Sequence, residues 1–300
     1  MRKQLRDCVY SMGLGKPAAA LRRLVIAWRQ KTLRMRYPSK RFEVFLDEHR
    51  VVYAVEDDYS RQWFFPRYAG GRLHEPPVTR LFAQHAAQAS GVADVGANLG
   101  WFTCLAGVFL PKGNVVSFEL DEGFCGLVQR NNALNGLDGA EVVNAAVGKE
   151  NGVIRYTRPA AAHPGMSLRG EKHGTEVEAP MVSLDEWFAG KPQPSLFKID
   201  VEGAERDVLL GMKRILSEQR PTLFLEVHPR KLPDFGTSIE EVLDIVRGHG
   251  YTLYEILDWR GGEDAQVAPL QTSPTQNDML LATPNEAPAR SHDSGPHGSR

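Results

Sequence analysis

The sequence predicts an α/β domain in which helices cover both faces of a mostly parallel sheet of seven strands. Three observations carry this prediction. Apolar runs alternate with longer helical segments from Gly91 onward, at the spacing of βαβ units. The first apolar run enters a glycine-bearing turn, and the next one ends in an acid, Glu119. Together these features are typical of a Rossmann-like domain.

The first part of the chain differs from the rest in charge. The whole chain has a formal net charge of -1, which gives no argument for a nucleic-acid partner, but residues 1–41 carry twelve lysines and arginines against one acid. Within them, residues 18–37 have the spacing of a basic amphipathic helix. Two interpretations stay open: a helix docked on the main domain with solvated arginines, or a contact with a membrane surface or another anionic partner.

Residues 42–77 precede the predicted sheet. The runs FEVFL and RVVYAV flank Asp47 and Glu48 and predict a β-hairpin, and the aromatic stretch WFFPRY follows. We therefore expect residues 1–77 to form an extension made of a basic helix and a hairpin. Residues 78–284 are expected to form the main domain, and residues 285–300, which are poor in apolar side chains, a disordered tail.

The main domain is expected to begin with a helix over residues 78–89. The seven predicted strands are Val92–Val95, Val115–Glu119, Glu141–Ala146, Ser195–Asp200, Thr222–His228, Tyr251–Ile256 and Met279–Thr283. The interval Gly152–Pro180 is too long and too rich in glycine, proline and charge for a simple connection, so it is our candidate for a substrate-facing flap.

The turn after the first strand has the features of a site for a nucleotide-like ligand. Gly96 and Gly100 allow the backbone to approach a ligand at the carboxyl end of the strand, where open sheets bind ligands. Asn98 replaces the second glycine of the dinucleotide fingerprint, which disfavours a pyrophosphate. Asp94 would repel phosphate but suits an ammonium group. A purely structural turn capped by Asp94 is the alternative.

Two further acids follow strand ends. Glu119 ends the second strand, where a carboxylate accepts both hydroxyl groups of a ribose in dinucleotide and adenosyl cofactors alike. Asp200 ends the fourth strand, within the run KIDVEGAE, and is expected opposite the first loop, close to the reacting group. Glu202 and Glu205 follow at the start of a helix, where acids also serve as ordinary caps.

These motifs together resemble one family. DVGANLGWFT, the acid in VSFELD, NAAVG, VSLDEW, FKIDVEGAE and LFLEVH, in this order and spacing, resemble the FkbM family of S-adenosylmethionine methyltransferases. The resemblance covers about residues 92–283. It implies a class I methyltransferase fold with S-adenosyl-L-methionine as the cofactor. For many relatives it also implies transfer to a hydroxyl oxygen of a macrolide, sugar or glycan.

The resemblance also implies which residues bind the cofactor. The residues that match the family's cofactor motifs are Asp94, Gly96, Asn98, Gly100, Glu119 and Asp200. Leu120, Asn144 and Ala145 are expected to join them from the neighbouring loops. Leu120 departs from the proline that often follows the acid in this family.

Methyl transfer to a neutral hydroxyl requires alignment and a general base. We expect His228 to be that base, because it ends the fifth strand on the same sheet edge as Asp200 and histidine titrates near neutrality. Asp200 and Glu202 are the alternatives. We expect no metal ion.

The expected partner is a small-molecule or glycan hydroxyl acceptor, with no nucleic acid, and the oligomeric state is not readable. The chain has no apolar run that spans a bilayer and no signal-peptide core, which indicates a cytoplasmic protein with the basic helix as a candidate contact to the inner membrane surface. Two other functions stay open. One is a non-catalytic S-adenosylmethionine-binding protein, and the other is an NAD(P)-dependent oxidoreductase, which shares Glu119 but needs the missing glycines.

Overall fold

The structure is a computed structural model that describes residues 41–65, 68, 73–110, 114–158 and 174–285. The predicted basic helix over residues 18–37, the centre of the predicted flap and nearly all of the predicted tail lie outside these ranges. The membrane contact and the disorder proposed for those segments therefore stay predictions. Within the described residues, no helix combines the length and the apolar character needed to cross a bilayer.

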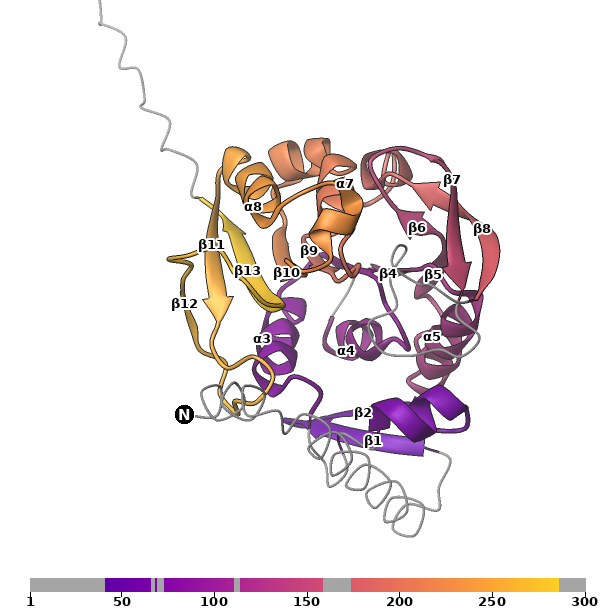
Figure 1. The fold of residues 1–300 in the computed structure, drawn as a ribbon. Coiled ribbons are helices and arrows are strands. Elements are labelled where there is room, and N and C mark those ends of the chain that lie inside the picture. The colour runs from indigo at the N-terminus through magenta and orange to yellow at the C-terminus, as the bar shows by residue number, and fades with distance from the viewer. Residues whose placement is uncertain (1–40, 66–67, 69–72, 111–113, 159–173, 286–300) are drawn as a thin grey trace, which may run out of the picture.

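The central sheet has eight strands in the spatial order β5, β4, β3, β9, β10, β13, β11, β12 (Figure 1). Their bounds are β3 Gly91–Val95, β4 Asn114–Glu119, β5 Glu141–Asn144, β9 Leu196–Ile199, β10 Thr222–Val227, β11 Tyr251–Ile256, β12 Val267–Pro269 and β13 Asp278–Pro284. The strands from β5 to β10 run parallel, whereas β13 is antiparallel to both of its neighbours. All seven predicted strands contribute to this sheet, which confirms the predicted Rossmann-like α/β fold.

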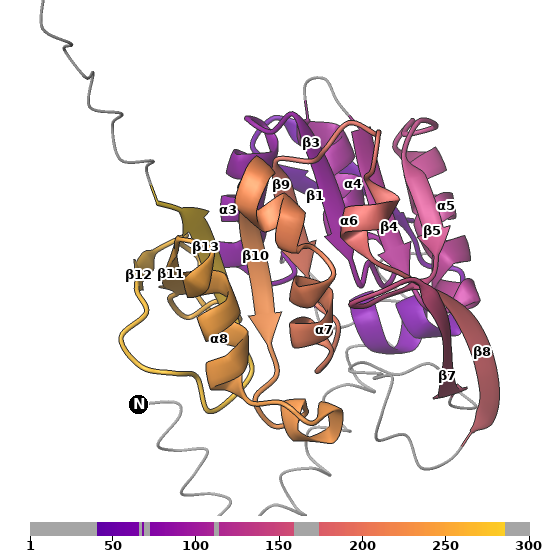
Figure 2. The same cartoon turned by 90° about the horizontal axis from the view of Figure 1, so that it is seen from above.

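Helices cover both faces of this sheet, as predicted (Figures 1 and 2). One face carries α3 Pro76–Ala86, α4 Trp101–Phe109 and α5 Glu122–Leu134, and the other carries α6 Leu184–Trp187, α7 Glu205–Leu210 and α8 Ile239–Gly248. Short helical turns are η1 Ser60–Phe64, η3 Ile215–Gln219 and η4 Leu232–Phe235. Successive side chains of a strand point to opposite faces, so Val92 packs into the core under α3 and α4, and Ala93 into the core under α7 and α8.

Helix starts follow from local capping chemistry. Pro76 begins α3 two residues before the predicted start, because the fixed backbone angle of proline suits the first turn. The carboxylate of Asp121 accepts hydrogen bonds from the amides of Gly123 and Phe124 and begins α5. The hydroxyl of Ser238 accepts one from the amide of Glu241 and begins α8.

A second, smaller sheet stands beside the carboxyl end of β4. It consists of β6 Ala146–Val147, β8 Thr175–Val182 and β7 Gly152–Arg158, in that order. The predicted strand Glu141–Ala146 is therefore two strands, because the chain leaves the central sheet after Asn144. The predicted flap begins and ends in strands: β7 and β8 pair antiparallel from Gly152 opposite Met181 to Arg158 opposite Thr175.

The predicted N-terminal hairpin is confirmed and is fixed to the main domain. Its strands are β1 Arg41–Leu46 and β2 His49–Ala54. The side chain of Asn135, the residue directly after α5, exchanges two hydrogen bonds of 2.8 Å with the backbone of Val52. The phenol of Tyr53 donates to the carbonyl of Trp101 at 3.0 Å, and the two rings stack with centroids 4.8 Å apart. Hairpin side chains thus belong to the same core as α3 and α4.

Candidate functional site

A pocket opens where the strand order of the sheet reverses. From β3 the chain continues outward through β4 and β5, and then returns to β9 on the other side of β3. Open α/β sheets bind ligands at such a switch point, outside the carboxyl ends of the strands. The predicted site residues that line this pocket are Gly96, Asn98, Glu119, Leu120, Ala145, Asp200 and Glu202. Tyr156 and Thr157 of β7 contribute to another side of it.

Gly96 makes the close approach of β3 and β9 possible. Its φ of 83° lies in the left-handed region, and its amide donates to the carbonyl of Phe118 at 2.9 Å. A Cβ atom at this position would lie 1.9 Å from the carbonyl oxygen of Asp200. Any larger residue would force the two strand ends apart, so glycine is required here for the geometry of the pocket.

Glu119 connects the end of β4 to the glycine turn. One carboxylate oxygen accepts from the amide of Asn98 at 2.7 Å and the other accepts from the amide of Asp121 at 2.9 Å. Burial raises the pKa of Glu119 to about 7, and these backbone hydrogen bonds oppose the rise. Each oxygen has a further acceptor position, so the ionised group can also receive two ligand hydroxyls from the pocket side.

Three predicted cofactor residues lie next to the pocket but do not line it. Asp94 is buried beneath the glycine turn, where its Oδ2 accepts from the Thr103 hydroxyl at 2.7 Å and its Oδ1 has no hydrogen bond. Gly100 precedes α4 and packs against Val128. Asn144 donates to the carbonyls of Glu119 and Leu120 and so supports the loop after β4.

The loop after β9 brings negative charge to the pocket. Asp200 accepts from the ammonium group of Lys198 through Oδ2 at 3.3 Å. Burial would raise the pKa of Asp200, but Lys198 and His228 hold it below its ordinary value. Glu202 accepts from the ammonium group of Lys231 at 2.7 Å. Glu205 is fully buried and accepts from the amide of Gly203, two residues before it.

The described residues that line the pocket include three acids, Glu119, Asp200 and Glu202. They include no lysine or arginine. A pocket with several carboxylates and no cationic side chain disfavours a dinucleotide, whose diphosphate carries negative charge. It suits a cofactor that carries a sulfonium and an ammonium group.

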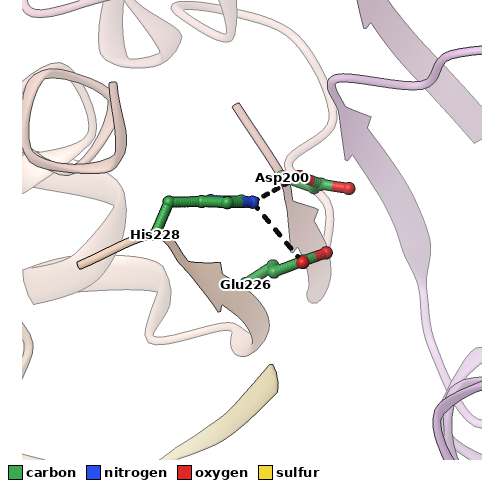
Figure 3. A group of neighbouring side chains, drawn as sticks. All are labelled: Asp200, Glu226 and His228. Atoms are coloured by element: carbon green, nitrogen blue, oxygen red, sulfur yellow. Dashed lines mark ion pairs between the residues drawn. The ribbon is translucent and has the colours of Figure 1, made fainter. Parts of the chain in front are cut away.

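His228 lies beside Asp200 (Figure 3) and is not among the described residues that line the pocket. Its side chain is buried, with Nδ1 2.7 Å from Glu205 and Nε2 3.1 Å from Glu202 and 3.4 Å from Glu226. Burial alone would lower the pKa of His228, but the contacts with these carboxylates raise it to about 12. A histidine that keeps its proton at neutral pH is a poor base, so these surroundings do not favour the role that we predicted for it.

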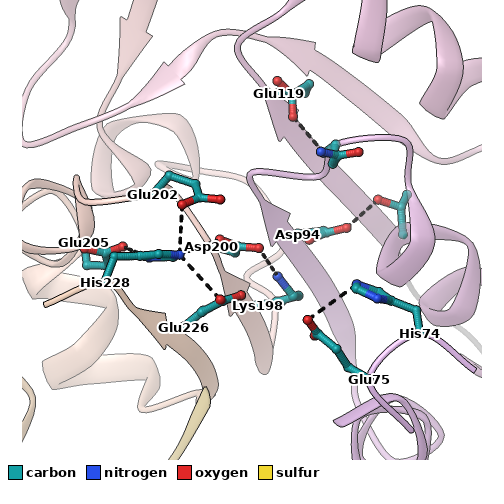
Figure 4. Close-up of polar contacts among 12 residues, drawn as sticks. His74, Glu75, Asp94, Glu119, Lys198, Asp200, Glu202, Glu205, Glu226 and His228 are labelled. Atoms are coloured by element: carbon teal, nitrogen blue, oxygen red, sulfur yellow. Dashed lines mark hydrogen bonds and ion pairs between the residues drawn. The ribbon is translucent and has the colours of Figure 1, made fainter. Parts of the chain in front are cut away.

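Three charged residues that we did not single out accompany the predicted ones (Figure 4). Lys198 and Glu226 are buried charged residues inside the apolar runs LFKI and TLFLEV. Burial raises the pKa of Glu226 to about 7, with the charge of Asp200 adding to the effect. Glu75 precedes α3, and burial raises its pKa well above the ordinary value. A charged residue within an otherwise apolar strand is the signal that could have identified the first two.

Comparison with known proteins shows which family the chain is similar to. The family model described as the methyltransferase FkbM domain matches residues 94–253. The chain is 31% identical over 217 residues to the 31-O-demethyl-FK506 methyltransferase FkbM of Streptomyces tacrolimicus, an alignment that covers 61% of this chain and 81% of that protein. The chain belongs to the FkbM methyltransferase family.

Two further similarities are more distant. Methyltransferase 1 of Beauveria bassiana is 27% identical over 147 residues, which covers 41% of this chain and 58% of that protein. The crystal structure of the FkbM methyltransferase from Methylobacillus flagellatus KT aligns with a TM-score of 0.41 and 17% identity, over 75% of this chain and 55% of that one. The chain thus matches little more than half the length of these two proteins.

Membership of the FkbM family confirms the prediction of an S-adenosylmethionine-dependent methyltransferase with S-adenosyl-L-methionine as its cofactor. The pocket of this FkbM protein fits that cofactor, because the described residues that line it include three acids and neither lysine nor arginine, which suits a positively charged donor. The alternative of an NAD(P)-dependent oxidoreductase is left without support.

Proposed function

We propose that this methyltransferase acts on a hydroxyl oxygen of a sugar, glycan or polyketide-like natural product. The observation that carries the proposal is the presence of two carboxylates, Asp200 and Glu202, on the pocket wall at the end of β9. Carboxylates there can accept the hydrogen bond of an acceptor hydroxyl. The name of the relative from Streptomyces tacrolimicus, which refers to a 31-O-demethyl compound, supports oxygen as the acceptor atom.

The cofactor side of the proposed site is formed by the ends of β3 and β4. The cofactor supplies an already activated methyl group, so the main task of the protein is alignment and exclusion of water. Glu119 accepts the ribose hydroxyls, the amide of Asn98 holds its carboxylate in place, and Gly96 keeps the ends of β3 and β9 close together. Leu120 and Ala145 lie on the side where the base of the cofactor would pack.

The acceptor side is formed by the loop after β9. Asp200 accepts from Lys198 through Oδ2, and the residue lines the pocket. Glu202 accepts a hydrogen bond from Lys231 and also lines the pocket. We propose that these two carboxylates orient the acceptor hydroxyl and that His228 holds them in place from behind.

Cofactor affinity is expected to fall as the pH drops below about 7, because Glu119 must be ionised to accept two hydroxyl groups and burial raises its pKa to about 7. Each pH unit below that value should cost up to about tenfold in affinity, and affinity should level off above pH 8. Calorimetric titration of the full chain with S-adenosyl-L-methionine between pH 5.5 and 8.5 measures this.

Glu119→Ala should weaken binding about 10- to 100-fold at pH 8 and abolish the pH dependence near 7. The matched control is Glu122→Ala, which removes an exposed acid at the start of α5 and should change neither property. Persistence of the pH dependence in Glu119→Ala would assign the titration to another acid, such as Glu226, and refute the ribose role.

The proposed reaction is tested with a donor that carries an isotopically labelled methyl group. The full chain is incubated with glycan, lipid-linked sugar and polyketide extracts, and the labelled products are treated with mild alkali. Hydroxyl methylation gives an ether, which survives that treatment. Label found only in alkali-labile esters or on nitrogen would contradict the proposal, and the absence of label from every extract would favour a non-catalytic cofactor-binding protein.

A further inference from the structure

The side chains behind the pocket form a group that we call the His228 cluster: His228, Asp200, Glu202 and Glu226. They come from two neighbouring strand ends, those of β9 and β10. One donor atom each of Asp200, Glu226 and His228 lies within 4.8 Å of the other two. Figure 3 shows the two carboxylates turned toward the imidazole from the same side. The mechanism proposed above uses Asp200 and Glu202 but assigns Glu226 no part.

The imidazole nitrogen Nε2 is the centre of this convergence. It lies 3.1 Å from Oε2 of Glu202, 3.4 Å from Oε1 of Glu226 and 3.8 Å from Oδ1 of Asp200. The side chain is only 1% exposed, and yet Nε2 makes no well-directed hydrogen bond with any of the three oxygens. Oδ1 of Asp200 also has no donor. An imidazole nitrogen and three carboxylate oxygens that converge on a common centre at these distances are the pattern expected of donor atoms arranged for an ion.

The orientation of the imidazole is fixed from its other side. Nδ1 lies 2.7 Å from Oε1 of Glu205, whose side chain is fully buried. Histidines that bind metals commonly donate the hydrogen of their second nitrogen to a carboxylate in this way, which fixes the ring and raises its basicity. Glu205 would therefore orient Nε2 toward the three oxygens without contacting the ion.

The charge around the cluster also favours a cation. Its carboxylates contact three cationic side chains: Lys198 at Asp200, which Figure 4 shows, and also Lys231 at Glu202 and Arg260 at Glu226. Each of its carboxylates thus has such a partner, and the buried carboxylate of Glu205 adds a fourth acid on the other side of the imidazole. Burying so many acids together is costly unless positive charge compensates them.

We propose that Asp200, Glu226 and His228 bind a divalent metal ion, with Glu202 as a further donor on the pocket side. An imidazole combined with carboxylates suits Mn²⁺, Fe²⁺ or Zn²⁺ better than Mg²⁺, which prefers oxygen donors alone. An ion can enter from the pocket, because Asp200 and Glu202 line it. Binding would displace the proton from Nε2, since a ligating imidazole must be neutral. The proposal departs from our expectation of a site without metal.

The ion would lie at the acceptor side of the pocket. A metal-bound hydroxyl has a lower pKa than a free one, so the ion would ease transfer of the hydroxyl proton to a carboxylate of the pocket wall and would make the acceptor oxygen a better nucleophile. This role rests on the proposed hydroxyl methylation, whereas metal binding itself does not.

The test is an equilibrium titration of the full chain with Mn²⁺, without cofactor or acceptor. The protein is treated with chelator, exchanged into metal-free buffer, and free Mn²⁺ is followed by electron paramagnetic resonance. The wild-type chain should bind one equivalent, and Zn²⁺ should compete for it. Asp200→Asn and Glu226→Gln should each weaken binding at least about tenfold. Glu240→Gln, the same change at an exposed acid of α8, should leave binding unchanged.

Thermal unfolding of each variant shows whether it is folded. If Glu226→Gln does not fold, Glu226→Asp, which keeps the charge but shortens the side chain, takes its place in the titration. Absence of saturable Mn²⁺ and Zn²⁺ binding by the wild-type chain overturns the proposal, as does binding that both Asp200→Asn and Glu226→Gln leave intact. The readout does not depend on methyl transfer. Stoichiometric metal binding without any ether product would refute the proposed reaction alone.

Discussion

Replacement of Lys198 by methionine is expected to lower the free energy of unfolding at pH 8 by about 3–5 kcal/mol. The side chain is 3% exposed, and its ammonium group lies 3.3 Å from Asp200 and 4.8 Å from the centre of the Phe102 ring. Burial would lower the pKa of Lys198, but Asp200, Asp94 and Glu226 raise it above its ordinary value, so the group is charged. Its removal leaves these buried acids without their shared cation.

The loss of stability should shrink as the pH falls toward 5. Lys198 helps to hold the pKa of Asp200 below its ordinary value, against the effect of burial. Without Lys198, the folded-state pKa values of the acids rise above those of the unfolded chain. The folded variant then binds protons more readily, so its stability increases as the pH falls through those values. Denaturant unfolding at pH 5 and pH 8 in the presence of chelator measures the difference.

The matched control is Lys191→Met. Lys191 is exposed and lies 3.8 Å above the ring of Trp187, so its loss should cost less than about 1 kcal/mol at either pH. An equal loss for Lys198→Met at both pH values would point to packing against Phe102 and not to charge. No loss at all would show that the acids are compensated without this lysine.

Gly96→Ala is expected to have the second large effect, a loss of at least about 3 kcal/mol in the free energy of unfolding. Part of this loss, about 1–2 kcal/mol, comes from the left-handed backbone angle. The rest comes from the new Cβ, which would lie 1.9 Å from the carbonyl oxygen of Asp200 and would push the ends of β3 and β9 apart. Because both strand ends line the pocket, cofactor affinity should fall by more than about tenfold in calorimetry.

Gly190→Ala separates the two contributions. Gly190 has a φ of 74°, similar to the 83° of Gly96, but a Cβ there would have no atom within 4 Å. It should therefore show only the cost of the backbone angle and an unchanged cofactor affinity. Similar losses for the two variants would mean that the contact between β3 and β9 relaxes easily.

The central sheet could be predicted from the sequence because its strands are buried on both faces and stand out as apolar runs between helices. β12 was missed because its three residues, Val-Ala-Pro, show no period. β7 and β8 were missed as strands for a different reason. Most of their side chains on both faces are exposed or partly exposed, so the alternation that marks a half-buried strand is absent.

The pocket was predictable in part because residues after parallel strands meet at one edge of the sheet. This rule brings Asn98, Glu119 and Asp200 together from their positions in the sequence, and all three line the pocket. It could not place Glu75, which precedes α3 and reaches the same region only through the packing of that helix. Nor could it show that α7 presents Glu205 to His228, which changes the acid–base character of the histidine.

The docking of the hairpin limits how far this protein can be truncated from its N-terminal side. Asn131 of α5 accepts from the amide of Ala54 and donates to the carbonyl of Leu99, so one buried amide connects β2 to the segment that leads into α4. Removal of residues 41–77 would leave Asn131 half-satisfied and would expose the apolar side of α4. The matched segment 94–253 is therefore shorter than the smallest piece expected to fold unaided, and deletion series that stop at its edges should yield aggregates in place of a minimal enzyme.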